Sequence, residues 1–91
     1  MTTTPTIHMN GSSRHHLVET YHASLLTLRE AIDSVRRTEP NARDYYVTGG
    51  QSYAAAQAEH LERLRKLEAV EAELRELWRS VRTRTGKAVK L

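Results

Sequence analysis

Residues 40–50 read Pro-Asn-Ala-Arg-Asp-Tyr-Tyr-Val-Thr-Gly-Gly, and they separate two long segments that have helical periodicity. Proline, asparagine and paired glycines favour turns, and a residue that precedes proline is displaced from the helical region. Two antiparallel helices need only about 2–8 connecting residues. The connection predicted here, residues 38–52, is longer than a hairpin requires, so we expect it to carry the function.

The segment before this connection predicts one helix over residues 13–37. Its apolar residues are spaced alternately by three and four positions, as at the a and d positions of a coiled coil. These residues are Val18, Tyr21, Leu25, Leu28, Ile32 and Val35. Ser12 or Ser13 is expected to cap the start of the helix. Arg29 and Asp33 are spaced to form an ion pair on its outer side.

The segment after the connection predicts a second helix over residues 53–82, and it begins with an alanine-rich run. The register expected for its inward face is Tyr53, Ala56, His60, Arg63, Leu67, Val70, Leu74, Leu77 and Val81. Arg63 interrupts this register, while Leu61, Leu64 and Trp78 fall beside it. So broad an apolar surface is typical of a helix that touches more than one neighbour.

Together these patterns predict an all-α fold in a single domain of 91 residues. We expect an antiparallel two-helix hairpin with a long functional loop, an extended arm over residues 1–12 and a basic tail over residues 83–91. A lone hairpin buries one face of each helix, which is too little to offset the conformational entropy of ordering about 80 residues. The hairpin is therefore expected to assemble as a homo-oligomeric helical bundle, a homodimer or larger.

The composition argues against several classes of function. The chain has no cysteine, which excludes disulfides and thiolate chemistry and favours the reducing cytoplasm. We expect neither a membrane span nor a secretory signal, since no apolar run approaches the roughly 18 residues that a bilayer requires. The histidines lack the spacing of a helical metal site, and no nucleophile–base or carboxylate pair stands out. We therefore expect a non-enzyme without cofactor or metal.

The net charge is +3, and basic residues gather near the end of the chain. Residues 79–91 contain no acidic residue and five basic ones, namely Arg79, Arg82, Arg84, Lys87 and Lys90. Such a segment can hold nucleic acid through its charge. It lacks interleaved aromatic residues, however, and the helix macrodipole alone favours cations at a helix end. Nucleic-acid binding is thus the weakest of three functional hypotheses.

The connection contains the strongest candidates for ligand binding, which are Asn41, Arg43, Tyr45, Tyr46 and Gly49. Arginine grips phosphate in a bidentate manner, and tyrosine offers a stacking face together with a hydroxyl group. The glycines lead into a helix whose first free N–H groups favour an anion. In the alternative interpretation, the tyrosines pack the loop onto the hairpin and Arg43 pairs with Asp44.

A second candidate lies near the start of the chain, at Asn10, Gly11, Ser12 and Ser13. Glycine lets a backbone approach a ligand closely, and free N–H groups with two hydroxyl groups suit an anion. The alternative interpretation is an ordinary helix cap.

These two motifs, taken together, resemble those of a family of short helical proteins in phage and prophage genomes. The motifs are Ile7-His8-x-Asn10-Gly11-Ser12-Ser13 and Pro40-Asn41-x-Arg43-Asp44-Tyr45-Tyr46-x-x-Gly49, and the similarity covers residues 7–81. More loosely, the chain resembles phage anti-defence sponges, small oligomeric proteins that sequester cyclic nucleotide or ADP-ribose-type immune signals without cleaving them. That resemblance implies ligand contacts at Asn10, Ser12, Arg43, Tyr45 and Tyr46, in the cytoplasm of a bacterial host.

The first hypothesis is therefore non-catalytic sequestration of a small anionic nucleotide-type signalling ligand. The alternative is a structural or adaptor protein, a coiled-coil-like phage component that binds another protein through its loop. Residues 10–13 and 40–50 should lie at opposite ends of a helix of roughly 36 Å, so one chain cannot bring both to one ligand. We expect a neighbouring chain that runs in the opposite direction to complete each site and to cover Leu61, Leu64 and Trp78.

Overall fold

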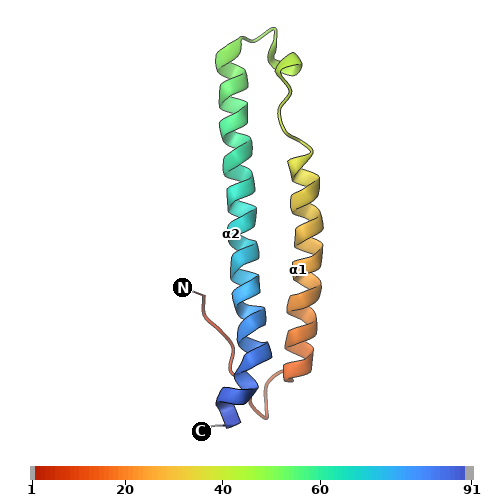
Figure 1. The fold of residues 1–91 in the computed structure, drawn as a ribbon, viewed down its shortest axis with the longest axis vertical. Helices are drawn as coiled ribbons and strands as arrows, with labels where there is room; N and C mark the ends of the chain where they lie inside the picture. The colour runs from red at the N-terminus through yellow and green to blue at the C-terminus, as the bar shows by residue number, and fades with distance from the viewer. Residues whose placement is uncertain (1, 90–91) are drawn as a thin grey trace.

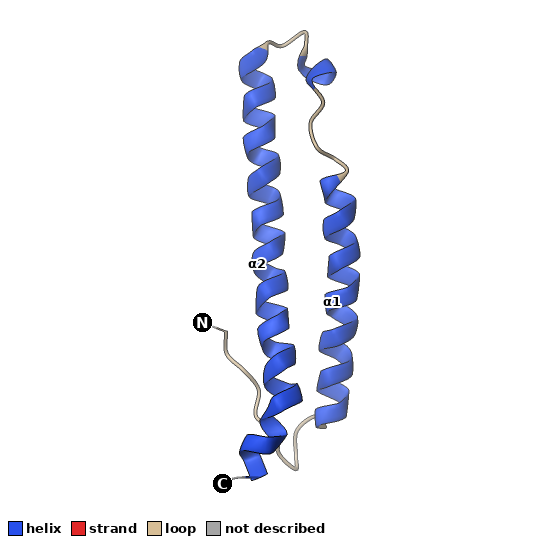
Figure 2. Ribbon diagram, in the orientation of Figure 1, coloured by secondary structure: helices blue, strands red, loops and turns tan. Residues whose placement is uncertain are grey.

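The protein is an elongated hairpin of two antiparallel helices (Figure 1). The computed structural model describes residues 2–89, with side chains as far as Arg82. Helix α1 is Arg14–Arg36, helix α2 is Gly50–Val89, and the 3-10 helix η1, Ala42–Tyr45, lies in the connection between them (Figure 2). The described part of the chain contains no strand. The molecule measures 64 × 22 × 18 Å, so the predicted helical hairpin is confirmed.

Helix α1 begins and ends within one residue of its predicted boundaries. The side chain of Ser13 accepts a hydrogen bond from the backbone N–H of His16 at 3.0 Å, which makes Ser13 the N-cap. At the other end, the backbone N–H of Arg37 donates to the carbonyl of Ser34 at 3.1 Å. Pro40 follows shortly after and prevents the helix from continuing. Local sequence signals therefore set both ends of α1.

Helix α2 extends beyond its predicted boundaries at both ends. It starts at Gly50 rather than at residue 53, because Gly49 adopts a φ of +97° that turns the chain directly into the helix. Its backbone remains helical to Val89, past the boundary predicted at residue 82. The basic side chains predicted for the tail at Arg84, Lys87 and Lys90 lie outside the described side chains.

The register predicted for α2 is wrong at Arg63 and Val70, which are exposed, while Leu77 is half-buried. Glu71 is buried and Trp78 stacks on His22 of α1, with ring centroids 5.3 Å apart, whereas Val70 is 45% exposed. The covered positions include His60, Leu64, Leu67, Glu71, Leu74, Trp78 and Val81, again with alternating spacings of four and three. The inward face therefore takes Leu64 and Glu71 in place of Arg63 and Val70, and it includes Trp78 beside Leu77. As a result, Trp78 already packs on α1 and Leu64 is half-buried, while Leu61 stays exposed.

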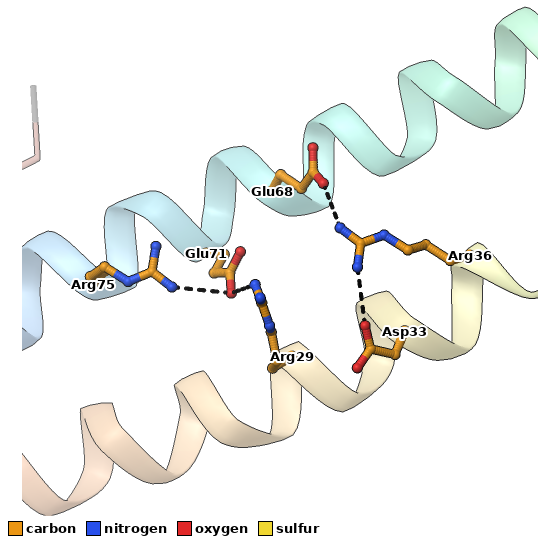
Figure 3. A network of polar contacts seen from close by, with 6 residues as sticks. All are labelled: Arg29, Asp33, Arg36, Glu68, Glu71 and Arg75. Atoms are coloured by element: carbon orange, nitrogen blue, oxygen red, sulfur yellow. Dashed lines mark hydrogen bonds and ion pairs between the residues drawn. The ribbon is translucent and has the colours of Figure 1, made fainter.

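A buried carboxylate explains this register (Figure 3). Oε2 of Glu71 lies 2.7 Å from Nη1 of Arg29 on α1 and 3.3 Å from Nη2 of Arg75 on its own helix. The Glu71 side chain is only 8% exposed, so the two guanidinium groups compensate for the loss of hydration. Arg29 thus reaches across to α2 instead of forming the predicted pair with Asp33.

Two further contacts align the helices. Arg36 bridges Asp33 of its own helix at 3.1 Å and Glu68 of α2 at 3.0 Å. Nη2 of Arg14 donates to the carbonyl of Arg82 at 3.3 Å. The start of α1 therefore lies level with Arg82, and the end of α1 lies level with Glu68.

The apolar core is thin. Among the described side chains, Leu25, Ile32 and Val81 are the buried apolar ones. The radius of gyration is 19.3 Å, against about 12 Å for a compact domain of this length. The chain exposes 7,096 Å², whereas a compact chain of this mass exposes about 5,400 Å². One chain alone therefore leaves more surface in water than a typical folded monomer.

Candidate functional site

Hydrogen bonds within the connection order its backbone. The side chain of Asn41 accepts from the backbone N–H of Arg43 at 3.0 Å and caps η1. The backbone N–H groups of Thr48 and Gly49 donate to the carbonyl of Tyr45 at 3.2 and 3.1 Å. Asn41 and Gly49, both predicted as ligand residues, therefore hold the shape of the loop. Their predicted ligand contacts stay predictions.

The two adjacent tyrosines differ in environment. Tyr45 is half-buried, and its ring lies against that of Tyr53 on α2, with centroids 6.1 Å apart. Tyr46 is 84% exposed. The interpretation that a tyrosine packs the loop onto the hairpin therefore applies to Tyr45, while the Tyr46 ring contributes little to packing within the chain.

Arg43 and Tyr46 line the same shallow depression. It has a volume of about 360 Å³, and Ala42 completes its lining. Among the described side chains, no ion pair joins Arg43 and Asp44, in contrast to the alternative interpretation of the loop. An exposed guanidinium beside an exposed phenol provides one group for a phosphate and one for an aromatic ring. The depression can therefore hold a small, charged and aromatic molecule.

The motif near the start of the chain forms a turn followed by a cap. The backbone N–H of Gly11 donates to the carbonyl of His8 at 3.2 Å. A Cβ atom at Gly11 would lie 2.7 Å from Nε2 of His8, an exposed side chain that is able to move aside. Ser13 is the helix cap, while Asn10 and Ser12 are exposed. The backbone of Gly11 thus takes part in the turn, Ser13 caps the helix, and Asn10 and Ser12 have side chains that are accessible to a ligand.

One chain does not bring the two predicted ligand motifs together. The connection and the turn before α1 lie at opposite ends of the hairpin (Figure 1). The 23 residues of α1 separate them, a distance of about 35 Å. A ligand that touches both motifs would need two chains.

No protein family, curated protein or solved structure matches this chain. Among the described side chains, no cluster of histidine, aspartate or glutamate residues is arranged to hold a metal ion. Within residues 2–89, neither helix has an apolar stretch of the length that a bilayer demands.

The sequence interpretation overlooked one exposed residue of the loop. Val47 follows Tyr46 and is 92% exposed, so an aromatic and an aliphatic side chain both project from the end of the hairpin. The available signal was an apolar residue placed among turn formers, between Tyr46 and Thr48. Such a residue lacks a helical face on which to be buried.

Proposed function

We propose that this protein is a non-catalytic binding protein that sequesters a small anionic nucleotide-type signalling ligand. The observation that carries the proposal is the depression lined by Arg43 and Tyr46, whose exposed side chains are not needed to pack the hairpin. The guanidinium would hold a phosphate, and the phenol ring would stack on the base. The resemblance to phage anti-defence sponges supports this class of ligand and the cytoplasm of a bacterial host as the place of action.

The shape of the depression limits how tightly one chain alone would bind such a ligand. The depression is shallow and lies at the end of a narrow hairpin, whereas a tight ligand site buries most of its ligand. Sequestration needs high affinity because each site holds one molecule and releases no product. Tight binding of the ligand therefore requires additional protein surface over it, supplied by self-association.

Thermal unfolding in the presence of candidate ligands tests this function. The panel contains cyclic dinucleotides, cyclic trinucleotides and cyclic ADP-ribose isomers, and one class should raise the Tm of the wild-type protein. Arg43→Ala and Tyr46→Ala should abolish that rise without changing the Tm of the free protein. Arg37→Ala, which removes another exposed arginine, is the matched control. A flat response to the whole panel would refute nucleotide sequestration.

Val47 favours a second candidate function, the adaptor. An exposed aliphatic side chain beside Tyr46 gains nothing from an anionic nucleotide but suits the apolar centre of a protein interface. Val47→Asp separates the two functions. Sequestration predicts that the variant still binds the active nucleotide, whereas the adaptor predicts that it loses a defined protein partner of the wild-type chain.

A further inference from the structure

One side of the hairpin carries apolar side chains that are half-buried or exposed in the described part of the chain. We call it the apolar face and define it by Leu28, Ala31 and Val35 of α1 with Val70 and Leu77 of α2. Leu28 and Val35 each precede an arginine of the ion-pair network by one residue, a rotation of about 100°. Val70 likewise precedes Glu71. Because the two helices are antiparallel, these rotations place Leu28, Val35 and Val70 on the same side of the hairpin. That side faces away from the ion pairs of Arg29 and Arg36.

The apolar face combines projecting and recessed parts. Val70 projects from α2 and is 45% exposed. A groove of about 440 Å³ runs along α1 beside Leu28. It is lined by Ala23, Ser24, Thr27, Leu28 and Ala31. Small side chains allow another helix to approach closely, so this shallow groove can lie against a helix of a second copy. The whole face can thus pack against the same face of a second chain.

The exposed area indicates what covers this face. The chain exposes roughly 1,700 Å² more than a compact chain of its mass. A stable interface of standard size buries about 800 Å² on each partner. The excess on one chain is therefore sufficient for one such interface. Three buried apolar residues, the number among the described side chains, are few for an independent domain.

We propose that the apolar face binds the same face of a second copy, about a two-fold axis level with Val70. The Arg29–Glu71 contact sets Val70 level with the groove of its own chain. A two-fold axis at this level, perpendicular to the helices, therefore places Val70 of each α2 against Val70 of the other α2 and the groove of each α1 against the groove of the other α1. The product is a four-helix bundle in which the two hairpins run in opposite directions.

This packing also completes the ligand site, a step that rests on the function proposed above. Tyr45 packs on Tyr53, so the loop lies level with Tyr53. Tyr53 is 17 residues, or about 26 Å, from Val70 along α2. Arg14 is hydrogen-bonded to Arg82, and Arg82 lies 12 residues, or about 18 Å, from Val70 in the other direction. The Asn10–Ser13 turn lies just beyond Arg14. The two-fold axis therefore brings the partner's Arg43 and Tyr46 to the level of Asn10 and Ser12.

The mass in solution tests the face. The wild-type chain should elute as a dimer, with twice the mass of 10.4 kDa, at micromolar concentration, and Val70→Glu should be a monomer that keeps its helical circular dichroism. Leu61→Glu is the matched control, because Leu61 is 58% exposed but lies on the other side of α2. A monomeric wild type, or loss of the dimer in Leu61→Glu instead, would overturn the proposal.

Cross-linking tests the face even if Val70→Glu fails to fold. The wild-type chain has no cysteine, so introduced thiols report on one contact each. Oxidation of Val70→Cys should give a covalent dimer, since the proposed axis brings the two copies of this position together across the interface. Leu61→Cys should give none. Equal yields from both variants would contradict the assigned face.

Mixing variants also tests the shared site, with the nucleotide that raises the wild-type Tm as the probe. Asn10→Ala and Arg43→Ala should each lose binding, and their mixture should regain one site in each mixed dimer. Binding by monomeric Val70→Glu at wild-type affinity would refute the shared site but leave sequestration standing. A flat ligand panel together with the Val70–Val70 cross-link would refute sequestration but retain the dimer.

Discussion

The middle of the hairpin, where α1 lies along α2, differs from the loop end in what its side chains contact. In the middle, Ile32 is fully buried, and Glu71 is held between two arginines. At the loop end, order comes from backbone hydrogen bonds and the contact of Tyr45 with Tyr53. Stability is therefore concentrated in the middle. The loop end can therefore present side chains that the fold does not need.

The largest effect is expected for Ile32→Ala. Ile32 has no exposed surface, and removing such a side chain costs about 2–5 kcal/mol, a large fraction of the stability of so small a domain. The midpoint of urea unfolding, followed by circular dichroism, should fall sharply. Leu26→Ala, at a position 57% exposed, should leave it nearly unchanged. Equal losses from both substitutions would mean that the middle does not carry the stability.

An intermediate effect is expected for Arg29→Ala. It removes the closest partner of the buried Glu71 carboxylate and should cost about 1–3 kcal/mol. Glu71→Leu completes an apolar seam and should be neutral or stabilising. In the Glu71→Leu background, Arg29→Ala should then cost little, which a double-mutant cycle measures. A full cost in that background would show that Arg29 acts through other contacts.

The smallest effects on stability are expected at the loop end, where the two tyrosines should behave in opposite ways. Tyr45→Ala loses the contact with Tyr53 and should cost about 1 kcal/mol, while Tyr45→Phe keeps it. Tyr46→Ala should change the stability by less than about 0.5 kcal/mol yet lose the ligand. Thermal unfolding with and without the active nucleotide separates these effects. Greater destabilisation by Tyr46→Ala would reverse the assignment of the two rings.

The sequence predicted α1 more accurately than α2. The six apolar residues of α1 offered one consistent spacing, and all six are buried or half-buried. On α2, two alternative registers for the inward face have His60, Leu67, Leu74 and Val81 in common. The apolar character of the side chains favoured the register that contains Val70. The choice was decided by Arg29, which lies 42 residues away and neutralises Glu71 across the hairpin. Local periodicity contains no information about that partner.

The loop residues could be predicted as a group but not individually. Turn formers and an arginine beside two tyrosines marked the connection as the candidate site. Which tyrosine packs and which is exposed depends on the 3-10 turn that Asn41 caps, because that turn orients the ring of Tyr45 toward α2. Short 3-10 segments have a weak periodic signal. The exposure of Tyr46 and Val47 therefore emerged only from the structure.

The alignment of the helices also implies an order of folding. Arg36 and Glu68 are 32 residues apart in sequence, Arg29 and Glu71 are 42 apart, and Arg14 and Arg82 are 68 apart. The entropic cost of closing a chain segment grows with its length, by about 0.6 kcal/mol for each doubling. The helices should therefore first meet near Arg36 and close progressively toward Arg14. In hydrogen exchange, the amides around Arg14 and Arg82 should open most readily, which makes the end that carries Asn10 and Ser12 the first to fray and the last to form.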